Sequence, residues 1–345
     1  MKGNELYKRT CSATGIRVPQ LQETSSTRPG PRAFSVLGGL FSVVVLTCFV
    51  GCRAVSERDV KRKVRMSTPE IKQLVKDRYG RFAETGGSRA PCCPSRKEPS
   101  SGYAIEEGLY REEELSSVPK IAMDLSRGCG NPCGFADLQS GEIVVDFGCG
   151  GGIDVILAAH KVGLDGKVVG IDFAPQMIQR AKQAVAEAGL QNRDIEFHVQ
   201  DIEKLELLDS FSDVVISNCV INLCPNKNAV YQEAFRVLRP GGRIAISDIV
   251  LTESIDPVLQ EHFQSTWAGC LGGVVPESDY IRSVKTAGFI EVQIVARHIL
   301  ATEELEAMGV CPGKDFAPAP AKDDLAKVQG KVASIKFTAR KPLLK

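Results

Sequence analysis

Short apolar runs alternate with amphipathic segments over the second half of the chain. Five runs have the length of strands: residues 142–147, 167–172, 194–199, 213–217 and 243–247. Between the second and third runs, one apolar face recurs at a helical period: Met177, Ile178, Ala181, Val185 and Ala188. Alternating strands and helices predict a parallel sheet covered on both faces, and residues 331–339 predict one more strand. We therefore predict a doubly wound α/β fold with a mostly parallel sheet and a C-terminal α+β extension.

The pattern also predicts a helix well before the sheet. Ser67 and Glu70 have the spacing of a capping box, and apolar positions then recur at a helical period. From residue 86 to 101 the chain is rich in Gly, Ser and Pro, which is typical of a loop. This predicted loop carries two adjacent thiols, Cys92 and Cys93.

Residues 33–52 are different because they contain no charge between Arg32 and Arg53. That length suffices for a membrane-spanning helix. More Lys and Arg follow the segment than precede it, which places the bulk of an anchored protein on the cytosolic side. A cleaved signal, or part of a presequence for a plastid or mitochondrion, remains the alternative. The expected regions are 1–32 (basic N-terminal or targeting region), 33–52 (anchor or signal), 53–65 (charged linker), 66–250 (cofactor-binding domain with its helical lead-in) and 251–345 (C-terminal region).

Composition narrows the classes of function. The chain has 345 residues and a formal net charge of +1, without the basic block that nucleic-acid binding requires, so we expect no nucleic-acid partner. Twelve cysteines are many, yet they are scattered, and a domain of this size needs no disulfide framework. Working thiols in a reducing compartment are the better interpretation. We expect a monomer.

The first predicted strand of the sheet runs into the glycine-rich stretch VVDFGCGGGIDVILAA, just before a helix. Glycines allow a tight turn and a close backbone approach to a ligand at a helix N-terminus. An acid ends the second strand, where it can bind ribose hydroxyls, and Asp201-Ile202 follows the third, where an adenine would lie. This pattern favours S-adenosylmethionine over a nicotinamide, the alternative. The candidate cofactor residues are Asp146, Gly148, Gly150, Gly152, Asp172, Phe173, Met177, Asp201, Ile202 and Asn218.

From Asp146 to Asp248 the sequence resembles the class I methyltransferases, which implies their Rossmann-like fold and S-adenosylmethionine as methyl donor. Three cysteine motifs, GCGNP, SNCVINL and GCLGG, together resemble the arsenite methyltransferases. The resemblance extends from about Val64 to the C-terminus. It implies Cys129, Cys219 and Cys270 as arsenic ligands and Cys92 or Cys93 as a further redox-active thiol. Residues 251–345 would then help to cover the arsenic site. Cys224 departs from the family pattern and adds a thiol near the same edge.

The chemistry of arsenic suits these residues. Trivalent arsenic is soft, and thiolates are the soft ligands of proteins. Arsenic held by three thiolates keeps a lone pair that can attack a methyl sulfonium, so a general base is not needed. The product arsenic is formally pentavalent, and two electrons must return from a dithiol that closes to a disulfide and is reset by glutathione or thioredoxin. Arsenite and methylarsenite are the expected substrates.

Three alternatives stay open at this point. A methyltransferase of a quinone, sterol or other small molecule would make the thiols incidental. A protein that only sequesters arsenic would bind it without methyl transfer. Structural zinc could use the spacings Cys129-x3-Cys133 and Cys219-x4-Cys224. Cys149, inside the glycine turn, is interpreted as a small buried hydrophobic residue.

Overall fold

The computed structural model describes residues 66–87, 109–264, 271–302, 304–305 and 322–343. All of them belong to the second of two compact units, Met1–Ser56 and Glu57–Lys345. Residues 33–52, Cys92, Cys93 and Cys270 lie outside the described residues, so the predictions made for them stay predictions. Within the described ranges, no helix combines the length and the apolar character needed to cross a membrane.

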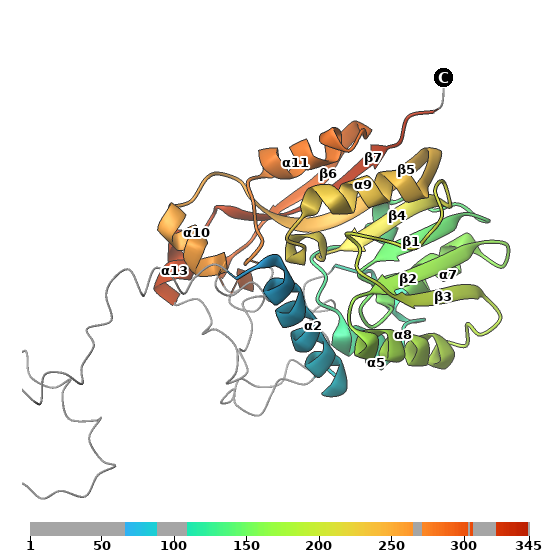
Figure 1. The fold of residues 1–345 in the computed structure, drawn as a ribbon. Coiled ribbons are helices and arrows are strands. Elements are labelled where there is room, and N and C mark those ends of the chain that lie inside the picture. The colour runs from blue at the N-terminus through green and yellow to red at the C-terminus, as the bar shows by residue number, and fades with distance from the viewer. Residues whose placement is uncertain (1–65, 88–108, 265–270, 303, 306–321, 344–345) are drawn as a thin grey trace, which may run out of the picture. The chain divides into compact units, whose positions relative to one another are not determined.

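Seven strands form one sheet in the order β3-β2-β1-β4-β5-β7-β6, parallel except for antiparallel β7 (Figure 1). Their bounds are β1 Ile143–Phe147, β2 Lys167–Asp172, β3 Asp194–Val199, β4 Ser212–Asn218, β5 Leu238–Leu251, β6 Ile290–Ile299 and β7 Val332–Arg340. The predicted doubly wound, mostly parallel α/β fold is confirmed.

The described helices precede, cover and follow this sheet. They are α2 Thr68–Glu84, α4 Glu112–Leu115, α5 Lys120–Leu125, α6 Pro132–Phe135, α7 Ile153–Val162, α8 Pro175–Glu187, the 3-10 turn η1 Ile221–Leu223, α9 Lys227–Val237, α10 Pro257–Gln264, α11 Glu277–Thr286 and α13 Lys322–Lys327. Helix α2 begins as predicted, because the Glu70 carboxylate accepts bonds from both the backbone N–H and the hydroxyl of Ser67, at 2.7 and 2.8 Å. Helix α8 buries the predicted face through Met177, Ile178 and Ala181.

The sheet separates two hydrophobic cores. Successive residues of a strand point to opposite faces, so Val144 belongs to the core under α7 and α8, and Val145 to the core under α9 and α11. The same alternation holds in β4, where Val214 and Ile216 face one core and Val215 the other. Both central strands therefore read as continuous apolar runs, as expected for a sheet covered on both faces.

The C-terminal region extends the same sheet. Strand β7 pairs with β5 over nine residues and with β6 on its other side, so the sheet continues across the boundary drawn at residues 250 and 251. Strand β6 was not predicted, and β5 is much longer than the predicted run of residues 243–247. The strand order turns back between β1 and β4, and parallel sheets bind ligands at the carboxyl ends of such neighbouring strands.

Candidate functional site

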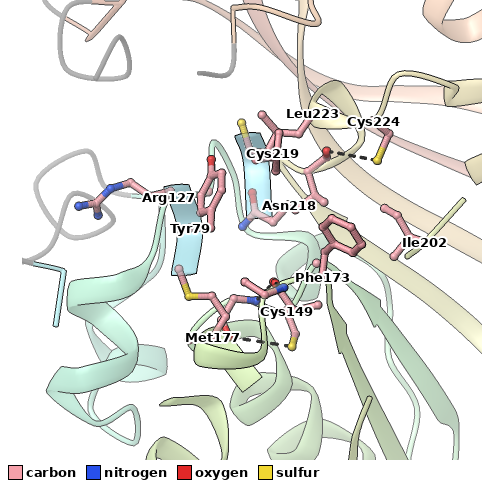
Figure 2. Close-up of a pocket in the computed structure, with 18 of the residues that line it drawn as sticks. Tyr79, Arg127, Cys149, Phe173, Met177, Ile202, Asn218, Cys219, Leu223 and Cys224 are labelled. Carbon is pink, nitrogen blue, oxygen red and sulfur yellow. Dashed lines mark hydrogen bonds between the residues drawn. The ribbon is translucent and has the colours of Figure 1, made fainter. Parts of the chain in front are cut away.

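A cavity of about 1020 Å³, its open mouth included, lies at the carboxyl ends of β1, β2 and β4 (Figure 2). Helix α2 contributes Lys72, Val75 and Tyr79 to its wall. Eight of the ten predicted cofactor residues line it. These eight are Gly148, Gly150, Asp172, Phe173, Met177, Asp201, Ile202 and Asn218.

The glycine turn folds tightly against β2. Gly148 has a φ of +79°, and a Cβ added there would overlap the side chain of Val220. Its backbone N–H and that of Cys149 both donate to the Ile171 carbonyl at 2.8 Å. Gly152, with a φ of +89°, is the N-cap of α7 and does not line the cavity. A side chain at Gly148 would therefore displace the turn, which is why this position needs glycine.

Asp172, at the end of the neighbouring strand β2, binds the glycine turn through its side chain. Its carboxylate accepts from the Gly150 N–H at 2.9 Å and from the Ala174 N–H at 2.9 Å. Burial in the cavity wall raises the pKa of this carboxyl to about 6, although these amides lower it. A carboxylate has about four acceptor positions. Capacity therefore remains for the hydroxyls of a ribose.

Asp146 lies beneath the turn rather than in the cavity wall. It is 2% exposed, and its Oδ2 atom has no hydrogen-bond partner among the described residues. Burial and the nearby carboxyls of Asp154 and Asp172 hold the pKa of Asp146 well above its usual range. Asp146 is absent from the cavity lining, so its predicted role in binding the cofactor stays a prediction.

The predicted adenine position carries an ion pair that sequence reasoning missed. Lys72 of α2 places its Nζ 2.6 Å from a carboxylate oxygen of Asp201 and 2.6 Å from one of Glu203. The two carboxylates raise the pKa of Lys72 against the opposing effect of burial. Helix α2 is thus tied over this end of the cavity.

Cys219 follows β4 directly and lines the cavity, as the position of SNC predicted (Figure 2). It is 3% exposed and has a φ of +61°, a backbone conformation that a residue with a side chain rarely adopts. Its N–H donates to the Ser247 carbonyl at 2.8 Å. Strain of this kind gathers at functional sites.

Cys129 belongs to the same apolar cluster as Cys219. Its N–H donates to Oδ1 of Asn218 at 3.0 Å, and its carbonyl accepts from the Ser334 hydroxyl at 2.8 Å. A Cβ at Gly128 would overlap the Asn218 amide, and one at Gly130 would lie 2.7 Å from Cβ of Ser247. The motif GCG therefore has a glycine on each side of its cysteine because Asn218 of β4 and Ser247 of β5 lie against this loop.

The other described cysteines are also buried. Burial holds the pKa values of Cys133 and Cys149 well above their usual range and also raises that of Cys224. Cys149 and Cys224 line the cavity, whereas Cys133 packs in the core under α7 and α8, apart from the cluster of Cys129. Within the described ranges, no group of three or more His, Cys, Asp or Glu side chains could hold a metal ion.

Sequence reasoning also missed Tyr79, Arg127 and Asp154 in the cavity wall. Asp154 follows the glycine turn by two residues and was visible as the acid in GGID. Tyr79 and Lys72 stand on one face of the predicted helix, but no local signal showed that this face meets the cavity. Arg127 places its guanidinium 4.1 Å from the ring centre of Phe82.

The residues present fit S-adenosylmethionine. A backbone turn without side chains, an acid with acceptor capacity and the apolar side chains of Phe173, Met177 and Ile202 suit a polar tail, a ribose and an adenine. The opposite wall is formed by Cys219 and its neighbours. A methyl donor and a thiol-bound atom would thus share one crevice.

Comparisons with known proteins agree with this geometry. A family profile described as a methyltransferase domain matches residues 138–295. The arsenite methyltransferase of Halobacterium salinarum is 37% identical over 258 residues, 71% of this chain and 64% of that protein. The arsenite methyltransferase of Mus musculus is 30% identical over 70% of this chain and 64% of its own length. The chain thus covers a little under two thirds of the length of each of these two relatives.

A solved structure is also similar. The crystal structure of an arsenic(III) S-adenosylmethionine methyltransferase from Chlamydomonas reinhardtii aligns with a TM-score of 0.55 and 29% identity, over 67% of this chain and 73% of that one. A [4+2]-cyclase shares the fold at 17% identity and a TM-score of 0.53, so the fold alone does not decide the reaction. Together with the cysteine motifs and the cavity, these relatives show that the chain belongs to the arsenite methyltransferase family of class I S-adenosylmethionine-dependent methyltransferases.

Proposed function

We propose that the protein methylates trivalent arsenic with S-adenosylmethionine, taking arsenite and methylarsenite as substrates. One observation carries the proposal: Cys219 lines the same cavity as the glycine turn and Asp172, and Cys129 is held beside it in one apolar cluster. A methyltransferase of a carbon, nitrogen or oxygen atom would have no use for two thiols at this edge.

Cys129, Cys219 and Cys270 would bind arsenic together. Three thiols displace the three hydroxyls of arsenous acid as water, which leaves arsenic with three sulfur ligands and its lone pair. Cys270 lies outside the described residues, so its share rests on the motif GCLGG. The apolar side chains of the same cluster, including Ile249, Leu251 and Phe263, exclude water from the thiols.

The chain's own residues bind and orient the reactants. When bound, S-adenosylmethionine supplies an electrophilic methyl group on sulfur. The glycine turn, Asp172 and Phe173 would hold it, and the thiols would hold arsenic with its lone pair facing the same crevice. No proton leaves the attacking atom, so proximity and orientation account for the acceleration.

The reaction cycle also requires two electrons to return arsenic to the trivalent state. Methylation takes arsenic from the trivalent to the formally pentavalent state, and a dithiol that closes to a disulfide returns two electrons. Cys92 or Cys93 would take part, and glutathione or thioredoxin would reduce the disulfide again. These thiols are outside the described residues, and their role rests on the family resemblance.

The N-terminal segment concerns location rather than chemistry. Residues 33–52 would anchor the protein with its catalytic domain on the cytosolic side, or direct it to an organelle. Fractionation of cells that express the full chain and a chain without residues 33–52 tests this. Equal distribution of the two would remove the role.

Arsenic speciation by chromatography with mass detection tests the proposal. The full chain is incubated with arsenite, S-adenosylmethionine and a thiol reductant, beside Cys219→Ser and Cys133→Ala. Cys133 is the matched control because it is equally buried but lies in another core. We expect methylated arsenic from the parent and from Cys133→Ala, and almost none from Cys219→Ser. Bound arsenite without product would instead indicate a binding protein, and methylation by Cys219→Ser would indicate incidental thiols.

A further inference from the structure

Tyr110, Asp154 and Asn218 form a buried hydrogen-bond relay next to the loop that carries Cys129. The Tyr110 hydroxyl donates to Oδ1 of Asp154 at 3.0 Å. The Asn218 side-chain amide donates to the Tyr110 oxygen at 3.0 Å and to Oδ2 of Asp154 at 3.0 Å. Tyr110 and Asp154 are 5% and 4% exposed. Three segments far apart in the sequence thus meet at one amide group.

The other end of that amide holds the loop of Cys129. Oδ1 of Asn218 accepts from the Cys129 N–H at 3.0 Å and from the Gly130 N–H at 3.2 Å. Its Nδ2 also donates to the Gly130 carbonyl at 2.7 Å. Asn218 immediately precedes Cys219 in the chain, and its side chain bonds the loop of Cys129. One residue therefore positions both cysteines.

The amide can do this in one orientation only. Rotation by half a turn would aim Oδ1 at the Asp154 carboxylate and Nδ2 at the two N–H groups, acceptor against acceptor and donor against donor. The Asp154 carboxylate and the two backbone N–H groups therefore favour the same orientation of Asn218, and Tyr110 donates to Asp154. Satisfied buried networks of this kind impose a unique geometry.

We propose that Tyr110 and Asp154 are positioning residues that set the place of Cys129 relative to Cys219 through the side chain of Asn218. The inference rests on the proposed function for its catalytic consequence. Tyr110 does not line the cavity. Its effect on the reaction therefore passes through Asn218 and not through contact with the methyl donor.

Tyr110→Phe is the first test, since it removes one oxygen and keeps the ring. Hydrogen exchange, followed by mass spectrometry on overlapping peptides that contain residues 127–131, reports on the Cys129 and Gly130 amides. We expect exchange to accelerate about fivefold, the change that corresponds to one neutral hydrogen bond. Asp154→Asn should accelerate it further, because Asn218 then loses its charged acceptor.

Tyr280→Phe is the matched control. Tyr280 is also fully buried and also donates to a buried aspartate, Oδ2 of Asp248 at 2.7 Å, but it does not reach Asn218. It should leave the exchange of the Cys129 and Gly130 amides unchanged. Equal acceleration in the control, or unchanged exchange in both relay variants, would overturn the proposal.

Kinetics separate positioning from general damage. For Tyr110→Phe we expect the KM for arsenite to rise or kcat to fall, by about fivefold in kcat/KM, with the KM for S-adenosylmethionine within about twofold of the parent. An equal loss toward both substrates would contradict a role through Cys129. If the parent methylates no arsenic, the proposed function fails, while the exchange measurement still decides whether the relay orders the loop.

Discussion

The pH dependence of cofactor binding follows from Asp172. Its carboxyl has a pKa of about 6 in the protein, against 3.8 without the protein surroundings. Ribose hydroxyls donate to an ionised carboxylate, so S-adenosylmethionine binding competes with protonation. At pH 5 about one carboxyl in eleven is ionised, and at pH 7 about ten in eleven. We therefore expect affinity to rise about tenfold from pH 5 to pH 7 and to level off above.

Titration calorimetry of the full chain with S-adenosylmethionine measures this rise. In two buffers with different ionisation enthalpies, binding at pH 5 should release about 0.9 proton per site, and at pH 7 about 0.1. Asp172→Asn should diminish the pH dependence, leaving at most the share of Asp154, whose carboxyl also lines the cavity and also has a pKa of about 6. It should weaken binding at pH 7 by roughly 2 kcal/mol, the typical contribution of a charge-assisted hydrogen bond.

Asp248→Asn serves as the control because Asp248 also has a pKa of about 6 but does not line the cavity. It should keep the pH dependence of binding. A flat affinity between pH 5 and pH 7 in the parent, or an undiminished slope in Asp172→Asn, would refute the assignment. The stability of the ligand-free protein changes with pH in the opposite direction. The raised pKa of Asp172 contributes to the free energy of unfolding below about pH 4, and this contribution is lost as the pH rises through about 6.

Other substitutions test the remaining contacts. Gly130→Ala should lower stability by about 1–3 kcal/mol, seen as a lower Tm, because its Cβ would collide with the buried Ser247; an unchanged Tm would contradict the packing. Lys72→Met should raise the KM for S-adenosylmethionine about fivefold, because the ion pairs with Asp201 and Glu203, worth about 1 kcal/mol, are lost. An unchanged KM would show that α2 packs over the cavity without these pairs. Cys149→Ala should keep arsenite methylation within about twofold, because a thiol whose pKa burial raises so far is a poor ligand, and loss of activity would assign it a role.

The sequence predicts the sheet's central strands because both of their faces are buried. A run such as IVVDF leaves no ambiguity when helices cover both sides. Strand β6 was not predicted, although Ile290, Val292 and Ile294 give its first half an apolar residue at every second position. The alternation ends at Val295 and Ala296, where the pairing with β7 shifts its register, and nearly all residues of the strand are exposed. Strand β5 was too short in the prediction because Pro240, Gly241 and Gly242 suggest a turn, whereas the strand runs through them.

The residues of the candidate site were likewise predicted only in part. The glycine turn, Asp172 and Cys219 are recognisable because each stands at a strand end, where topology alone brings them together. The partners of these residues come from distant segments: Lys72 meets Asp201, and Tyr110 meets Asn218, across more than a hundred residues. A single sequence carries no signal for such pairs, because nothing in the local pattern says which buried polar group satisfies which.

A single-turnover experiment tests the central claim most directly. The reduced full chain is loaded with one equivalent of arsenite, freed of excess, and mixed with S-adenosylmethionine carrying a radiolabelled methyl group. If arsenic sits on Cys129 and Cys219 facing the bound donor, label should pass to arsenic in one phase, with at most one methyl per protein, and Cys219→Ser should show no such phase. Label that stays on the donor although both molecules are bound would contradict the shared crevice.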